Sequence, residues 1–271
     1  MKYTVVGGKG FIGNTIVRYL EKGSEQVWVP EKNDASLFDV DLGTVIYCAG
    51  HGDCVNNPFK VLESNTILLS NILESASFDR LIYLSSTRVY MDQAESNEDS
   101  FLTISSRDSR RLFNLTKLVS EELLLKSQKD VVIVRPSNVY GLALNSPLFL
   151  PSIVKNAINT GQVDMYVSPE YAKDYVSVYD VSEITILLAK DKSTIGGIYN
   201  IASGVNITAQ DISEVLKQET QCKIIWHENN VQESFPVTRI DKIVDTYAYK
   251  PRSVLTDLVS MIASFTASLG K

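Results

Sequence analysis

The feature that most constrains the fold of this 271-residue chain is a glycine-rich turn near its start, within VVGGKGFIG. An apolar strand is expected at Lys2–Val6, and a helix with amphipathic spacing at Phe11–Lys22. Between them come three glycines, Gly7, Gly10 and Gly13. A strand that turns tightly on glycines into a helix points backbone N–H groups and the helix dipole at a pyrophosphate. Glycines also serve as plain turns, but in a chain that continues as alternating strands and helices they predict a dinucleotide-binding site.

The first half of the chain repeats this alternation of short apolar strands and helices. Further strands are expected at residues 26–29, 43–50 and 80–86, a strand that runs into a turn at 130–141, and helices at about 57–76 and 107–126. Strand–helix–strand units close right-handed into a parallel sheet that carries helices on both faces. The sequence therefore predicts an α/β fold with a Rossmann-like, doubly wound parallel sheet.

After Gly141 the alternation gives way to smaller elements. We expect a hairpin-like element within residues 162–177, a helix capped by Thr208, and a terminal helix that ends at Gly270. These elements predict a smaller α+β substrate-binding domain. The predicted division assigns residues 1–140 to an NAD(P)-binding Rossmann domain, to which 175–200 return, and 141–174 and 201–271 mainly to the substrate-binding domain.

Charge and cysteine usage narrow the class of protein. The net charge is −6, and the lysines and arginines form no basic run, so we expect neither nucleic acid nor an anionic membrane as a partner. Cys48, Cys54 and Cys222 have no metal-binding spacing, which predicts reduced thiols and no metal site. No apolar run approaches the roughly 20 residues that span a bilayer. The expected location is the cytoplasm.

Further motifs occur in order along the chain: LIYLSSTRVY, FNLTK, VRPSNVYG, AKDYVSVYDVSE, YNIASGVNITAQDISEVL and YKPRSVLTDLVSMI. Together with the GxxGxxG spacing of the glycines, they resemble the extended short-chain dehydrogenases/reductases of the nucleotide-sugar epimerase, dehydratase and 4-ketoreductase group. The resemblance spans about residues 3–262. It implies an NAD(P)-dependent enzyme that acts on a nucleotide-diphosphate sugar. It also implies a homodimer formed by the helices at 57–76 and 107–126, unless the sheet uses up their apolar stripes.

The resemblance assigns three catalytic positions. Ser86 takes the place of the hydroxyl that hydrogen-bonds the reacting sugar oxygen, and Lys117 the place of the lysine that holds the nicotinamide ribose. Phe113 stands where the family carries its proton-transferring tyrosine, four residues before the lysine and on the same helix face. A phenyl ring has the shape of that tyrosine but no proton to give.

Three explanations account for Phe113. The first, which we favour, is an engineered Tyr→Phe change, because the neighbouring residues match a working enzyme of this group. The second is a natural variant whose acid is another residue, with Tyr90, Thr87 or His51 as candidates. The third is a family member that binds a nucleotide sugar without turnover.

The choice between NAD and NADP depends on the charges near the second predicted strand. Glu31 would accept a hydrogen bond from a ribose hydroxyl and repel a 2′-phosphate, whereas Lys9 and Lys32 could pair with that phosphate. In the family, a basic residue at the position of Lys9 often accompanies NADP, so NADP(H) is slightly favoured over NAD(H). The expected cofactor-binding residues are Gly7, Lys9, Gly10, Phe11, Ile12, Gly13, Glu31, Lys32, Ala49 and Lys117.

The substrate residues are also implied by the motifs. They are Ser86, Thr87, Asn138, Lys173 and Arg239. Thr87 and Arg88 stand where the dehydratases carry an acid pair, which argues against 4,6-dehydration. The interpretation slightly favoured is a 4-keto-sugar reductase, with a 4-epimerase holding NAD and a redox-silent binding protein as alternatives. The motifs leave the nucleotide base and the sugar open.

Overall fold

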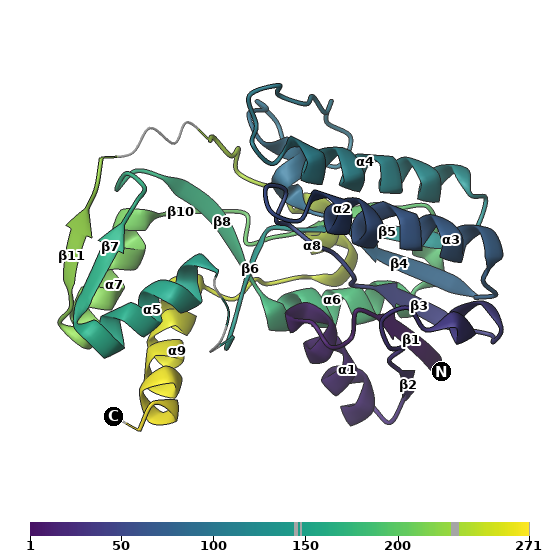
Figure 1. Ribbon diagram of the computed structural model, residues 1–271, viewed down its shortest axis with the longest axis horizontal. Helices are drawn as coiled ribbons and strands as arrows, with labels where there is room; N and C mark the ends of the chain where they lie inside the picture. The colour runs from purple at the N-terminus through teal and green to yellow at the C-terminus, as the bar shows by residue number, and fades with distance from the viewer. Residues whose placement is uncertain (144–145, 147, 229–232, 271) are drawn as a thin grey trace.

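The protein is described by a computed structural model that covers residues 1–143, 146, 148–228 and 233–270. Its centre is a six-stranded parallel sheet of order β2-β1-β3-β4-β5-β9 (Figure 1). The strands are β1 (Lys2–Val6), β2 (Gln26–Trp28), β3 (Thr44–Tyr47), β4 (Arg80–Leu84), β5 (Val131–Pro136) and β9 (Ile198–Ile201). The predicted doubly wound parallel sheet is confirmed.

Helices cover both faces of this sheet (Figure 1). One face carries α1 (Phe11–Lys22) and α6 (Val178–Lys190); the other carries α2 (Pro58–Leu62), α3 (Leu68–Ser75) and α4 (Arg111–Lys126). Successive residues of β4 alternate between the two cores, because side chains of a strand point to opposite faces. Every residue of β4 is buried, as expected for a strand covered on both sides.

The strand order places a topological switch point at the carboxyl edge. The chain leaves β1 to pair β2 on one side and returns to pair β3 on the other. Ligands of open α/β sheets bind in the crevice at such a point. On the β2 side, the chain forms only a 3₁₀ turn, η1 (Ala35–Phe38), before β3, so the sheet is short at this edge.

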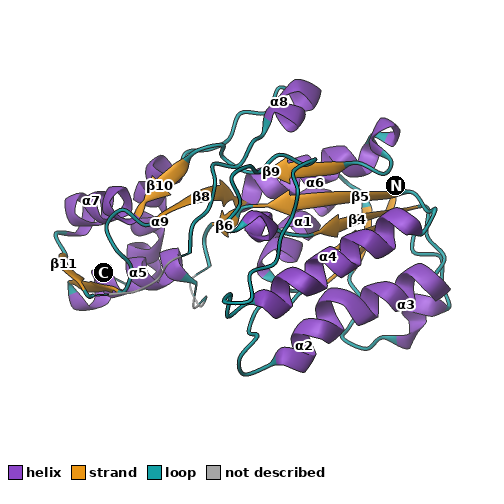
Figure 2. Cartoon of the chain, turned by 90° about the horizontal axis from the view of Figure 1, so that it is seen from above, coloured by secondary structure: helices purple, strands orange, loops and turns teal. Residues whose placement is uncertain are grey.

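A smaller part stands beside the sheet and holds a second core (Figure 1). In it, β6 (Asn138–Tyr140), β8 (Ala172–Ser177) and β10 (Asn206–Thr208) form one sheet, and β7 (Gln162–Met165) pairs in parallel with β11 (Lys223–Trp226). Three helices cover them: α5 (Phe149–Thr160), α7 (Ala209–Thr220) and α9 (Val254–Ser268). Figure 2 shows the two parts side by side from above.

Several local expectations can be compared with these elements. Thr208 caps α7 through a capping box with Asp211, as predicted for a helix N-terminus. The hairpin expected within 162–177 is wrong. Its strands β7 and β8 belong to different sheets, because β7 pairs with β11 and β8 with β6 and β10.

Two segments cross the predicted domain boundary. β6 belongs to the smaller sheet by its pairing with β8, although it precedes residue 141. Conversely, α8 (Asp241–Tyr247) places Ile243 in the core of the large sheet. The assignment of the two parts to cofactor and substrate stays a prediction. In the described part of the chain, no helix has both the length and the apolar character to cross a membrane.

Candidate active site

The glycine-rich turn joins β1 to α1 at the carboxyl edge of the sheet. Gly7 has a φ of +82°, and a Cβ there would lie 2.6 Å from the backbone nitrogen of Ala49. Gly10 is the N-cap of α1 and offers no side chain to the N–H groups of the first turn. The N–H groups of residues 11–13 therefore remain available to an anion. The close approach to Ala49 requires glycine at position 7, and the open helix end fits a pyrophosphate.

An ion pair between Lys9 and Glu31 stands beside this turn. The two side chains are 67% and 71% exposed, so a ligand can reach both. Lys32 is exposed as well. A phosphate here would meet two cations, and the carboxylate that would repel it is already paired with Lys9.

Lys117 and Phe113 lie on one face of α4, above the end of β4. The Lys117 ammonium donates a hydrogen bond to the Leu84 carbonyl at 2.8 Å. It lies 4.8 Å from the ring centroid of Tyr83 and 5.8 Å from that of Phe113. Ser86 lies two residues after this strand end, and its hydroxyl accepts a hydrogen bond from the Arg88 backbone N–H. The end of β4 and α4 thus bring the three predicted catalytic positions to one edge of the sheet.

Burial changes the acid–base properties of Lys117. Its side chain is 4% exposed, and this desolvation lowers the pKa of the ammonium from 10.5 to about 8. The nearby Glu121 carboxylate opposes the shift in pKa without cancelling it. A lysine poised near neutral pH can influence the protonation of any group beside it.

A buried ion pair holds α4 against the sheet. Arg135 of β5 donates to both carboxylate oxygens of Glu121, at 3.1 and 2.5 Å. The Tyr90 hydroxyl accepts from Arg135 at 2.6 Å and donates to Asn200 at 3.0 Å. Tyr90 is therefore engaged in a buried network, and burial raises the pKa of its hydroxyl.

A single π-helical turn, η2 (Glu63–Ile67), joins α2 to α3 and places Asn65 in the interior. The Asn65 amide accepts from the His51 backbone at 2.9 Å and donates to the Thr116 hydroxyl at 3.0 Å. It therefore ties the loop after β3 to α4. The Nε2 atom of His51 is buried and has no hydrogen-bond partner among the described residues.

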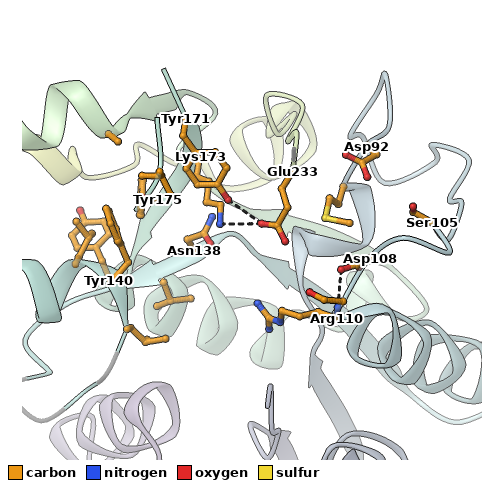
Figure 3. A pocket seen from close by; sticks show the side chains of 18 of the residues that line it. Asp92, Ser105, Asp108, Arg110, Asn138, Tyr140, Tyr171, Lys173, Tyr175 and Glu233 are labelled. Carbon is orange, nitrogen blue, oxygen red and sulfur yellow. Dashed lines mark hydrogen bonds and ion pairs between the residues drawn. The ribbon is translucent and has the colours of Figure 1, made fainter. Parts of the chain in front are cut away.

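A cavity of about 970 Å³ opens between the large sheet and the smaller part (Figure 3). Asn138 and Lys173 line it, and Glu233 lies between the charged groups at its centre. Glu233 accepts from the Tyr171 hydroxyl at 2.9 Å and lies 3.8 Å from the Lys173 ammonium. The cavity has the size and the polar lining of a small-molecule site.

The model of the NAD dependent epimerase/dehydratase family matches residues 3–202. The chain belongs to this family. The matched segment extends from β1 to just beyond β9, and it contains the glycine turn, Ser86, Phe113 and Lys117.

Curated relatives with named activities match most of the chain. A GDP-6-deoxy-D-talose 4-dehydrogenase of Aggregatibacter actinomycetemcomitans is 24% identical, with 90% of this chain and 86% of the relative covered. A GDP-L-fucose synthase of Sinorhizobium fredii is 21% identical, with 84% and 81% covered.

Two solved structures have a similar fold. MoeE5 in complex with UDP-glucose and NAD superposes with a TM-score of 0.86 at 18% identity, over the whole of both chains. RMD from Pseudomonas aeruginosa complexed with NADPH gives a TM-score of 0.81 at 20% identity, with 99% of this chain and 100% of the other covered. At these identities the likeness establishes the fold alone.

The structure separates the predicted substrate residues. Asn138 and Lys173 line the cavity, and the Asn138 amide donates to the Asp174 backbone carbonyl at 2.8 Å. Thr87 is buried as the first residue of the 3₁₀ turn η3 (Thr87–Tyr90), for which Ser86 is the N-cap, and it does not line the cavity. Arg239 lies outside the cavity lining; its side chain is 64% exposed and pairs with Asp241 at the start of α8.

The sequence motifs did not indicate several polar residues that meet at the cavity of this protein. Arg88 donates to Asp108 at 2.8 Å and to Glu233 at 3.0 Å, and Arg110 lines the same wall. Glu233 is 145 residues from Arg88 in sequence, so no local spacing could indicate their pairing. Arg110 and Asp108 stand directly before α4, where charged residues pass as ordinary helix-end polarity.

Proposed function

We propose that the chain is an NAD(P)-dependent oxidoreductase that acts at C4 of a nucleotide-linked sugar, as a 4-keto-sugar reductase. The observation that carries the proposal is the buried Lys117 with Phe113 on the same helix face, at the sheet edge that also holds the glycine turn. The named activities of the relatives, a 4-dehydrogenase and a GDP-L-fucose synthase, support the same chemistry. The cavity lined by Asn138 and Lys173 is the proposed sugar-nucleotide site.

Each residue has a distinct role in the proposed reduction. The glycine turn binds the cofactor pyrophosphate, and Lys117 hydrogen-bonds the ribose and stabilises negative charge on a phenol at position 113. The Ser86 hydroxyl donates to the C4 oxygen. A bound reduced nicotinamide supplies the hydride. The group at position 113 ordinarily supplies the proton, and a phenyl ring has none.

Phe113 thus predicts an arrested catalyst, and we favour an engineered substitution. If the chain is a natural variant, Thr87 or His51 remains as the alternative acid, because the Tyr90 hydroxyl is bound in the buried network. His51 has the stronger case of the two, since its Nε2 atom lacks a partner in the described structure.

The decisive experiment restores the hydroxyl. Phe113→Tyr is expected to oxidise NADPH faster than NADH, and only when a 4-keto nucleotide sugar is added, by at least about 100-fold over the unchanged chain. Phe113→Leu is the matched control and should stay inactive. The NADPH oxidation recovered in Phe113→Tyr should be lost again when Lys117→Met is added.

A 4-epimerase that retains NAD is the second candidate. Glu31, shortly after β2, favours it, because a carboxylate suits the free ribose hydroxyl of NAD. Copurified NAD, and turnover of a nucleotide hexose without added cofactor, would decide for epimerisation. Cofactor binding without turnover in Phe113→Tyr would instead indicate a redox-silent binding protein.

We also propose that two copies associate through the outer face of α4 and α2. Leu115, Val119 and Leu123 recur at every fourth residue of α4 and are 41%, 48% and 38% exposed. Phe59 of α2 is 86% exposed. A continuous apolar stripe on neighbouring helices is typical of a protein–protein interface. We further propose that the large sheet binds the dinucleotide and that the smaller part binds the sugar nucleotide.

A further inference from the structure

Arg110 lies at the wall of the cavity, and within the described residues its guanidinium has no ion-pair partner. Its guanidinium makes no hydrogen bond to any residue that the structure describes, and its Nε atom is buried. The side chain extends from the start of α4 toward the middle of the cavity (Figure 3). Arg110 as a whole is only partly buried, but its buried Nε–H lacks an acceptor, which is costly, so the arrangement indicates that a ligand supplies one.

The neighbouring carboxylates are already used by other donors. Asp108 accepts from Arg88 at 2.8 Å and from the Asn114 amide at 2.9 Å. Glu233 accepts from Arg88 and Tyr171 and lies near Lys173. Burial, together with the nearby Arg88 charge, lowers the pKa of Arg110. Among the described residues here, Arg88 and Lys173 thus lie beside carboxylates, whereas Arg110 has no such partner.

Arg110 stands directly beside the proposed reaction centre. Its guanidinium carbon lies 4.8 Å from the Phe113 ring centroid, while Lys117 approaches the same ring at 5.8 Å. A Cβ on Gly52 would lie 3.1 Å from its NH2 nitrogen, so the guanidinium reaches the loop after β3. A ligand group that contacts Arg110 must therefore be attached close to the substrate carbon that reacts beside residue 113.

We propose that Arg110 binds a carboxylate on the sugar, and that the substrate is a nucleotide-linked hexuronic acid or its 4-keto form. The proposal rests on the proposed function, because reaction at C4 determines which substituents lie beside position 113. On a pyranose these are the C3 hydroxyl and the C6 group, whereas the diphosphate is attached across the ring at C1. A neutral hydroxymethyl group at C6 leaves the guanidinium unpaired. A planar carboxylate matches its paired N–H groups.

The test measures binding to the unchanged chain, because Phe113 prevents turnover from obscuring the equilibrium. With saturating cofactor, calorimetric titration compares each nucleoside diphosphate (UDP, GDP and dTDP) with its hexose and its hexuronate. For the nucleotide base that the protein binds, we expect the nucleotide hexuronate to bind at least about tenfold more tightly than the nucleotide hexose. Arg110→Gln should abolish this difference and leave hexose binding unchanged.

The matched control is Arg107→Gln, which removes an exposed arginine from the same cavity wall and should keep the hexuronate preference. Equal binding of hexose and hexuronate would overturn the carboxylate proposal and leave the proposed function standing. If Arg110→Gln weakens free diphosphate, hexose and hexuronate equally, Arg110 contacts the diphosphate and the proposal is wrong. If none of the three nucleoside diphosphates binds, the proposed function itself fails.

Discussion

The ring of Phe113 lies near two cations: the guanidinium carbon of Arg110 is 4.8 Å and the ammonium of Lys117 5.8 Å from its centroid. A hydroxyl added to this ring would ionise in a positive environment. Nearby positive charge favours a phenolate over a phenol, so it lowers the pKa of a tyrosine. Position 113 is therefore built to make a tyrosine acidic, although the present residue cannot use that property.

We predict that the tyrosine introduced by Phe113→Tyr has a pKa clearly below the usual value of about 10. Ultraviolet absorbance titration against the unchanged chain isolates this one tyrosine. Combining the change with Arg110→Gln should raise the pKa again. Ketone reduction needs the protonated phenol, so its rate should fall as the pH rises through this pKa. An unshifted pKa would contradict the arrangement of the two cations.

A second prediction at this scale concerns Lys117. Its folded-state pKa of about 8 lies below its ordinary value of 10.5, so between these pH values the unfolded chain binds more protons than the folded one. Stability should therefore rise with pH across this window, and the cost of the buried charge is fully present below about pH 8. Lys117→Met should raise the free energy of unfolding at pH 7 by about 1–3 kcal/mol, measured by urea denaturation.

The control for this measurement is Lys126→Met. This lysine ends the same helix, its side chain is 79% exposed, and its removal should change stability by less than about 0.5 kcal/mol. Loss of stability in Lys117→Met would mean that the hydrogen bond to the Leu84 carbonyl outweighs the desolvation of the ammonium.

At the scale of elements, buried polar contacts hold α4 against the strand β5 and the turn η2. The pair between Glu121 and Arg135 is buried, with 4% and 3% of the two side chains exposed. Removing one partner of a buried pair leaves an uncompensated charge. Ser120, one residue earlier, donates to the Asn65 carbonyl at 2.7 Å and secures the same turn of α4. These contacts orient Phe113 and Lys117.

Glu121→Gln should therefore lower the free energy of unfolding by about 3 kcal/mol, because Arg135 loses its counter-ion. Glu122→Gln provides the comparison on the next residue. Its carboxylate is 65% exposed and lies 3.5 Å from Lys126, a surface pair that contributes little. Chemical denaturation of both variants gives the two values, and equal losses would argue against the anchoring role of Glu121.

The helix expected at residues 57–76 contains a π-helical turn that its sequence did not predict. Apolar spacing predicted one continuous helix over 57–76, and the chain is helical there, but η2 widens it by one π turn. The widening places Asn65 between the loop after β3 and Thr116 of α4. π turns of this kind are frequent at functional sites. Periodicity detects the buried stripe but not a change of pitch within it.

At the scale of the whole molecule, the exposed stripe of α4 should decide the oligomeric state. Val119→Lys combined with Leu123→Lys places two charges in the proposed interface and should convert a dimer to a monomer in sedimentation velocity. Leu187→Lys is the control, because Leu187 is 44% exposed on α6, on the opposite face of the sheet. A monomer in the unchanged chain would refute the dimer.

The sequence by itself determined the large parallel sheet, the glycine turn, and the shared helix face of Phe113 and Lys117. These features depend on local spacing: glycines at a strand end, apolar runs, and residues four apart on a helix. Local spacing also identified Thr208 as the cap of its helix, which the capping box confirms. The roles assigned to Ser86, Lys117 and the cofactor residues remain predictions from the family pattern.

Only the tertiary structure decided which charges meet. Glu233 pairs with Arg88, which lies 145 residues away in sequence. The strand β7 pairs with β11 and not with its sequence neighbour β8. Among the described residues, Arg110 has no hydrogen-bond acceptor for its guanidinium. The physical reason is that pairing across a cavity depends on how separate cores pack together, and short-range patterns carry no record of that packing. The open guanidinium beside position 113, from which we infer an acidic sugar, is a property of this packing.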